Sequence, residues 1–454
     1  MSRDADAAGP PGIALLAAAL AAVVVLVAVY AGSSFGLADG ADVLAFSSGI
    51  FDMDVRRVVT DLATGDPALR QSVHPLQKLL IAPFGSALDA VLFGGRDPHA
   101  AARIVIALCM AIQSLVVAVL AWQLTRRSQS AALAAGVLCA FSFSTFLAAS
   151  IPESAAVAAL ASTLPLLLLN ARWGRPLSAG ECVSWGALVV IGLGLTLTQV
   201  VHGAIAFAVR LSLGREASAA DTPARALVGR VLLTLAVAIS LLWGGLDLQQ
   251  RLYPARGLTG ARHPLTVELE FTRTAELSAR PVTHATRLLA HFFVIDFVAP
   301  FPAYSDFLMR LYGLDHWSLS AEEAGWSQWA PAQRALAGAV LLAVLAAAAG
   351  LRRADVRMLA PALCVASQLA LHFFYGREYV LYSPHWHGVL VALLVAAAWR
   401  RFPARQRAMS LAAVGLALAM LVNDVAVMRT VYREVAVGLG ADARDADGAP
   451  HGSP

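Results

Sequence analysis

Apolar runs close to the length of a membrane crossing recur along the chain, and they restrict its fold more than any other feature. A helix needs about 20 mostly apolar residues to cross a bilayer. Hydrophobic residues make up 58% of the 454 and charged residues only 14%, which excludes an ordinary soluble enzyme and a disordered chain. The apolar runs lie at about 13–31, 101–124, 131–149, 154–170, 185–198, 203–213, 228–246, 335–351, 357–375, 386–399 and 407–427. We therefore predict an all-α, polytopic membrane helical bundle of about eleven transmembrane helices.

The short loops between these runs alternate between arginine-rich and base-poor. The arginine-rich loops contain Arg126 and Arg127; Arg172 and Arg175; Arg210, Arg215, Arg225 and Arg230; Arg352, Arg353 and Arg357; and Arg400, Arg401, Arg405 and Arg407. Basic loops face the cytoplasm in membrane proteins. We therefore predict a cytoplasmic N-terminus, with the long segments 32–100 and 247–334 and all the histidines on or near the outer face.

Two stretches of the long outer segments are themselves apolar. Pro75 to Leu92 and Leu288 to Phe301 are interrupted by polar residues, among them Lys78 and Asp296. We predict that they form amphipathic or re-entrant helices at the outer surface, because a further crossing would invert every later arginine-rich loop. The expected organisation is a single membrane domain over 1–428, followed by a polar C-terminal tail over 429–454.

Acidic residues just after the first predicted helix are candidates for catalysis. Asp54, Arg57 and Asp61 are spaced i, i+3 and i+7, so a helix would place them on one face. A partly desolvated carboxylate at the edge of a bilayer is suited to act as a general base. The alternative is a solvated surface helix with salt bridges. Glu153, between two uncharged apolar runs, is either functional or a carboxylate favoured by the helix dipole.

The stretch from His372 to His387 ends one predicted helix and begins the next. Its tyrosines and tryptophan are typical of an interfacial belt. Arg377 stands out, because the other short outer turns carry no base. His385 and His387 are two residues apart and would point away from each other on a helix, which argues against a metal pair. The turn from Thr196 to His202 is explained by capping and turn chemistry.

Several classes of function have no support in the sequence. There is no P-loop, dinucleotide fingerprint, GxSxG or HExxH motif, so no nucleotide cofactor is expected. The four cysteines are far apart and form no CxxC motif, which argues against redox chemistry. The net charge of +4 is small and dispersed, so nucleic acid is not an expected partner.

The first outer segment resembles that of a known superfamily. Residues 51–61 follow the pattern FDxDxxRVxxD, and His74-Pro75-Leu76 leads toward a second predicted helix that ends in Arg126-Arg127. This arrangement resembles the C-type glycosyltransferase superfamily, integral-membrane enzymes that use polyprenyl-phosphate-linked sugars, and most of all bacterial relatives of the protein mannosyltransferase and aminoarabinose transferase group. The turn at Glu153 and the outer loop over 375–387 resemble corresponding loops of that group.

The resemblance implies a function and a set of roles. A sugar would pass from a polyprenyl-phosphate donor to a lipid, glycan or protein acceptor on the extracytoplasmic face of a bacterial inner membrane. The implied roles are catalytic for Asp54, Asp52 and Glu153, phosphate-binding for Arg57, Arg70, His74 and Arg377, and binding of a divalent cation, Mg²⁺ or Mn²⁺, for Asp52 and Glu153. The alternatives are a secondary transporter or lipid flippase, or an envelope polymerase or ligase of another class.

Overall fold

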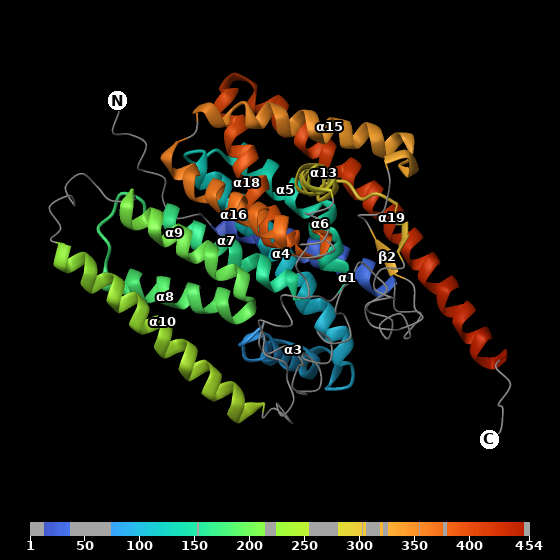
Figure 1. Ribbon diagram of the computed structural model, residues 1–454, viewed down its shortest axis with the longest axis horizontal. Coiled ribbons are helices and arrows are strands. Elements are labelled where there is room, and N and C mark those ends of the chain that lie inside the picture. The colour runs from blue at the N-terminus through green and yellow to red at the C-terminus, as the bar shows by residue number, and fades with distance from the viewer. Residues whose placement is uncertain are drawn as a thin grey trace.

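The fold is a bundle of helices, seen in a computed structural model of the chain (Figure 1). The structure describes residues 13–36, 74–151, 154–213, 224–253, 280–301, 303–305, 318–320, 326–353, 355–375 and 379–448. The longer helices are α1 (Ile13–Gly36), α3 (Gln77–Phe93), α4 (Pro98–Leu124), α5 (Gln129–Ala140), α6 (Phe143–Ser150), α7 (Ala155–Ala171), α8 (Ala179–Leu195), α9 (Val200–Ser212), α10 (Ala224–Leu252), α13 (Pro281–Ala290), α15 (Pro331–Ala348), α16 (Leu359–Phe374), α18 (Pro384–Arg401) and α19 (Gln406–Gly448).

Short elements join these helices. They are the 3-10 turns η4 (Leu197–Gln199), η7 (Trp326–Gln328), η8 (Leu351–Arg353), η9 (Val356–Met358) and η10 (Pro403–Arg405), the π-helical turn η6 (His291–Ile295), the single-turn helix α17 (Tyr379–Tyr382), and the strands β1 (Ala303–Ser305) and β2 (Ser318–Ser320). The strands pair antiparallel, with Tyr304 opposite Leu319. The helical class is confirmed, and this small hairpin is an addition to it that the apolar pattern did not predict.

Each predicted apolar run is largely helical, although one is broken into two helices, and the number of crossings is not confirmed. By length and composition, five segments of the described chain could cross a membrane: Pro98–Leu124, Arg225–Leu252, Pro331–Ala348, Val356–Phe374 and Pro403–Val431. The bent pair of α5 and α6 would make a sixth. The runs at 154–170, 185–198 and 203–213 form α7, α8 and α9, which have 17, 17 and 13 residues and are short for a bilayer of about 30 Å.

The predicted run at 131–149 is broken into α5 and α6, which are inclined at 55° to each other. Ser142 lies at the break, and its hydroxyl donates to the Cys139 carbonyl at 2.8 Å. The backbone N–H of Ser144, in the first turn of α6, donates to the Asp296 carbonyl at 2.9 Å. The break is therefore stabilised, because a distant segment satisfies a donor that a helix N-terminus leaves open.

The centre of the bundle is formed by α4 and α18. Helix α4 packs against α1, α3, α5, α6, α7 and α18, while α18 also contacts α5, α7, α15 and α16. Most of α18 is buried, including Trp386 and Trp399. In contrast, α10 lies at the edge of the bundle beside α8 (Figure 1), and only 6% of its most apolar stretch is buried. The exposed apolar face of α10 is what a lipid-facing helix presents.

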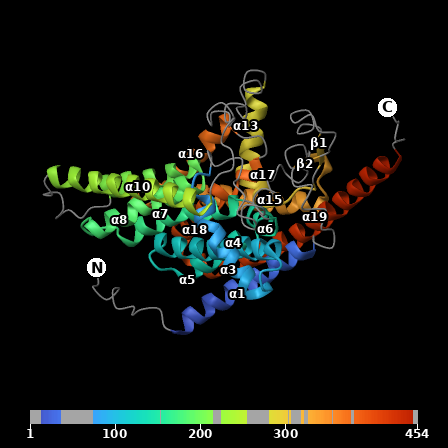
Figure 2. The same cartoon turned by 90° about the horizontal axis from the view of Figure 1, so that it is seen from below.

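The predicted surface helix at 75–92 corresponds to α3. The one predicted at 288–301 is helical only as far as Ile295, in the end of α13 and in η6, and much of it is buried in the bundle, including Phe292 and Asp296. Figure 2 shows α13 upright on the side of the bundle opposite α1, and Figure 1 shows it end-on. At the C-terminus, α19 extends beyond the bundle (Figure 1). The predicted boundary between residues 428 and 429 falls inside α19, which continues to Gly448.

Candidate functional site

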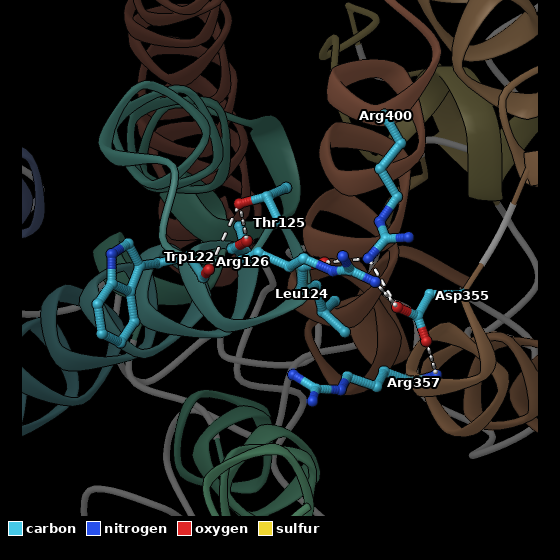
Figure 3. A network of polar contacts seen from close by, with 8 residues as sticks. Trp122, Leu124, Thr125, Arg126, Asp355, Arg357 and Arg400 are labelled. Atoms are coloured by element: carbon cyan, nitrogen blue, oxygen red, sulfur yellow. Dashed lines mark hydrogen bonds and ion pairs between the residues drawn. The ribbon is translucent and has the colours of Figure 1, made fainter. Parts of the chain in front are cut away.

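The arginine-rich loops lie together at one end of the bundle. Asp355, just before η9, accepts hydrogen bonds from the guanidinium groups of Arg400 at 2.9 Å and Arg126 at 3.4 Å (Figure 3). Arg400 also donates to the Leu124 carbonyl at 3.3 Å, and the backbone N–H of Arg357 donates to Asp355 at 3.1 Å. One carboxylate therefore ties together the ends of α4 and α18 and the beginning of α16.

The other two arginine-rich loops join the same face. The guanidinium of Arg357 lies 5.7 Å from the centre of the Trp173 ring, in the loop after α7. Arg210, at the end of α9, donates to the Arg175 carbonyl at 2.8 Å and forms a buried ion pair with Glu181 at 2.7 Å. All five loops predicted to be cytoplasmic are thus connected at one end of the structure, as an alternating topology requires.

Away from that face, residues 74–76 of the first predicted outer segment are fixed against the bundle. The Nδ1–H of His74 donates to the carbonyl of Leu195, the last residue of α8, at 2.5 Å. The Leu76 N–H donates to the Gly194 carbonyl at 2.8 Å, and the Gln249 amide donates to the Pro75 carbonyl at 2.7 Å. Residues 74–76 are therefore held between the ends of α8 and α10.

Four imidazoles from distant parts of the chain gather beside this segment. His385, in the first turn of α18, and His202, in the first turn of α9, lie on helices that both pack against α16, which carries His372, and His74 is bonded to the end of α8. We call these four residues the histidine cluster. His202 and His372 are fully buried and His385 is 6% exposed. The cluster joins three parts of the chain that the sequence placed on the outer face, namely residue 74 of the first long segment, the beginning of α9, and the end of α16 with the beginning of α18.

Hydrogen bonds fix the protonation pattern of His202. Its Nδ1 donates to the Ser162 carbonyl at 3.1 Å, because a carbonyl can only accept. Its Nε2 then accepts from the Gln368 amide, 3.1 Å away. A neutral ring satisfies both partners, and α7, α9 and α16 are joined through this one side chain.

His372 lies among aromatic rings that lead to a buried carboxyl group. Its ring centre is 4.9 Å from that of Tyr382 and 4.7 Å from that of Trp386. The Trp386 indole N–H donates to Oδ2 of Asp296 at 2.8 Å. Asp296 is fully buried, and this burial raises the pKa of its carboxyl well above the usual value, although the Trp386 hydrogen bond acts in the opposite direction. The carboxyl therefore favours its neutral, protonated form.

Several buried polar atoms close to the cluster have no hydrogen-bond partner within the described segments. They include both amide atoms of Gln199, the Nδ1 atom of His385 and Oδ1 of Asp296. Such atoms are uncommon in folded proteins and are costly unless water or a ligand satisfies them. Comparable atoms occur elsewhere in the described bundle, for example on Asn170 and Asp424, so they do not by themselves mark a binding site.

His74 is the only predicted site residue that falls within the described residues. Asp52, Asp54, Arg57, Arg70, Glu153 and Arg377 lie outside them, as does the predicted cation site of Asp52 and Glu153. Among the described residues, no three His, Cys, Asp or Glu side chains are placed to hold a metal ion.

Sequence reasoning did not single out three of the residues found here: His202, Gln368 and Asp296. The turn containing His202 was explained as capping, and Asp296 as a break in an apolar run. Two sequence features could have indicated them: the histidines predicted to lie on one side of the membrane, and the carboxyl of Asp296 inside an apolar stretch.

No protein-family model matches this sequence, and comparison with curated proteins and with solved structures also finds no match.

Proposed function

We propose that the chain is a membrane glycosyltransferase that moves a sugar from a polyprenyl-phosphate donor to a lipid, glycan or protein acceptor on the outer face of the membrane. The observation that carries the proposal is the bond of His74 to the end of α8, from which the chain leads through η4 to His202 and its bond to Gln368 of α16. It brings residue 74 of the long acidic segment to the part of the bundle where α16 leads toward α18. A reaction site built from both parts of the chain needs this proximity.

The proposed chemistry requires a base and a set of cations. Asp54, or Asp52 in its place, accepts the proton of an acceptor hydroxyl as the oxygen attacks the anomeric carbon and the bond to the carrier phosphate breaks. General-base assistance of this kind contributes about 10²–10⁴-fold. The leaving phosphate gains negative charge, and the guanidinium groups of Arg57, Arg70 and Arg377 stabilise that charge.

In this proposal the histidine cluster orients the site. The hydrogen bond to Leu195 fixes the ring of His74 through Nδ1, which directs Nε2 away from the backbone of α8. In the proposed site the positive charge for the phosphate comes from the guanidinium groups, because a neutral imidazole such as that of His202 carries none.

The test combines a deletion with purified protein. Loss of the gene is expected to remove a surface or lipid glycan and to cause its carrier-linked sugar to accumulate. In detergent, His74→Ala should lower transfer strongly, while His99→Ala, a histidine of the same long segment outside the cluster, should leave it unchanged. An unaltered glycan profile, or equal transfer by the two variants, would count against the proposal.

A buried polar path favours a second candidate, a transporter. Gln113, in the middle of α4, donates to the hydroxyl of Thr163 in α7 at 2.8 Å. The neighbouring Ser162 binds His202 through its carbonyl oxygen. Polar residues inside a bundle are typical of substrate pathways. Uptake or flipping by protein reconstituted in vesicles, abolished by Gln113→Leu while transfer of sugar is absent, would establish this alternative.

A further inference from the structure

A partly open cavity lies between four helices of the bundle. Its volume is about 590 Å³, and residues of α5, α15, α18 and α19 line it; Figure 1 shows where these four helices lie. Its walls contain several alanines, among them Ala343 and Ala347 of α15, Ala398 of α18 and Ala412 of α19. Small residues normally allow helices to pack closely. Here they leave a space large enough for a ligand.

The walls of this cavity are apolar along almost their whole length. Arg405, in η10, is the only charged residue among the described residues that line it. Its side chain is exposed at the end of the cavity that lies close to the arginine-rich face. The cavity therefore suits a long apolar molecule that carries negative charge at one end.

The length of the cavity approaches the thickness of one leaflet of a bilayer. On α18 the lining extends from Val391 to Trp399, which at 1.5 Å per residue is about 12 Å. Half of a hydrocarbon core of about 30 Å is about 15 Å. Exposed leucines flank the cavity on the helices that border it, with Leu342 of α15 at 70% and Leu411 of α19 at 75%, so both helices present apolar side chains outward to lipid.

We propose that this cavity binds one anionic phospholipid of the cytoplasmic leaflet. An acyl chain of the lipid lies between α15 and α19, and its phosphate lies at Arg405. The leaflet follows from the predicted topology, in which the loop that carries Arg400 and Arg405 faces the cytoplasm. The site is separate from the proposed outer reaction site. Such a lipid would fill a void between α15 and α19, and so stabilise the position of both helices.

The proposal is tested by lipid titration of the delipidated, detergent-purified full chain, followed by native mass spectrometry. The probes are phosphatidylglycerol and phosphatidylcholine with identical acyl chains. The expected result is one tightly bound phosphatidylglycerol. Arg405→Ala should weaken its binding about fivefold, the effect of one cation near a membrane surface, and should leave phosphatidylcholine unaffected. Arg407→Ala, the exposed neighbour outside the lining, is the charge control and should change neither.

A second pair of variants tests the cavity itself. Ala343→Phe fills the space and should abolish binding of both lipids, while Leu342→Phe, on the exposed face of the same helix, should not. Ala412→Phe fills the cavity from the opposite wall if the first variant does not fold. Equal effects of Arg405→Ala and Arg407→Ala, or lipid binding that survives both cavity-filling variants, would overturn the proposal. The proposal would also be overturned if an equal concentration of polyprenyl phosphate displaced phosphatidylglycerol. The same holds if the protein formed a dimer that the cavity-filling variants dissociated.

Discussion

His74 and Leu195 are joined by a hydrogen bond of 2.5 Å although 121 positions separate them in the chain. This contact, with the one between Leu76 and Gly194, fixes residues 74–76 of the first long outer segment against the end of α8. It fixes the position of His74, a member of the histidine cluster, and the proposed reaction site depends on it.

Substitution of Gly194 should disturb this contact selectively. A Cβ atom at Gly194 would lie 2.7 Å from the Cβ atom of Leu76, closer than two side chains can pack, so Gly194→Ala must displace the segment 74–76. We expect destabilisation of about 1–3 kcal/mol, typical of overpacking, and a loss of sugar transfer. Gly180→Ala on the same helix meets no atom within 4 Å and is the matched control. Equal thermal stability and transfer of the two variants would contradict the role given to this contact.

The buried ion pair of Glu181 and Arg210 should be important for stability. Both side chains are at most 1% exposed, and Glu181 also accepts from the Trp185 indole at 3.2 Å. Arg210→Met leaves a buried carboxylate without its cation, which should cost about 3–5 kcal/mol. The exposed pair of Asp247 and Arg251 provides the control, and Arg251→Met should cost about 0–1 kcal/mol. Thermal unfolding in detergent compares the two; similar losses would show that burial does not strengthen the first pair.

The contribution of Asp355 to the stability of the folded protein should depend on pH. Partial burial raises the pKa of its carboxyl, but the Arg357 N–H and the guanidinium groups of Arg400 and Arg126 lower it by more, so the folded pKa lies below the usual value. Because the pKa of this carboxyl is lower in the folded than in the unfolded protein, its ionised form stabilises the fold at pH values above the unfolded pKa of about 3.9. This stabilisation is lost as the pH falls through the folded pKa.

Wild type should therefore exceed Asp355→Asn in stability by about 1 kcal/mol near pH 7, a modest value because the network is partly exposed to solvent. The difference should disappear as the pH is lowered below about 4. Arg400→Ala should cost more than Arg126→Ala, since the Arg126 side chain is 74% exposed and that of Arg400 only 20%. A difference between wild type and Asp355→Asn that persists in acid would indicate a contribution other than charge.

The orientation of the bundle can be tested by labelling. Arg172→Cys and Arg401→Cys lie in loops predicted to be cytoplasmic, while Arg280→Cys lies in the predicted outer segment. In intact cells a membrane-impermeant thiol reagent should label only Arg280→Cys, and permeabilisation should expose the other two. The four native cysteines are buried or partly buried, which keeps the background low. Labelling of Arg401→Cys from outside would overturn the topology and the leaflet assigned to the lipid.

The sequence predicted the positions of the helices well, because burial in lipid or protein requires continuous apolar runs. It placed the beginning of α8 near residue 185, because the charged Glu181 interrupts the apolar pattern. The helix in fact begins at Ala179. The ion pair with Arg210 allows that carboxylate to be buried, and a pairing between residues 29 positions apart is not visible in local patterns.

The site was predictable only in part, for a similar reason. The topology placed the histidines at one end of the bundle, but it did not indicate that His202 would bind Gln368, 166 positions away. Such pairs depend on how the helices pack. The bend between α5 and α6 was also missed, since the carbonyl that completes the N-terminus of α6 belongs to Asp296.

The most direct test of the proposed function is sugar transfer from a carrier-linked donor by purified variants of Asp54 and Asp52. Asp54→Asn keeps the side-chain volume and removes the proton acceptor, so it should abolish transfer while the protein remains folded and inserted in the membrane. Asp52→Asn should weaken transfer less, unless it holds a cation, in which case added Mg²⁺ or Mn²⁺ should partly restore activity. Near wild-type turnover by Asp54→Asn would contradict the assignment of the base and make Glu153 the next candidate.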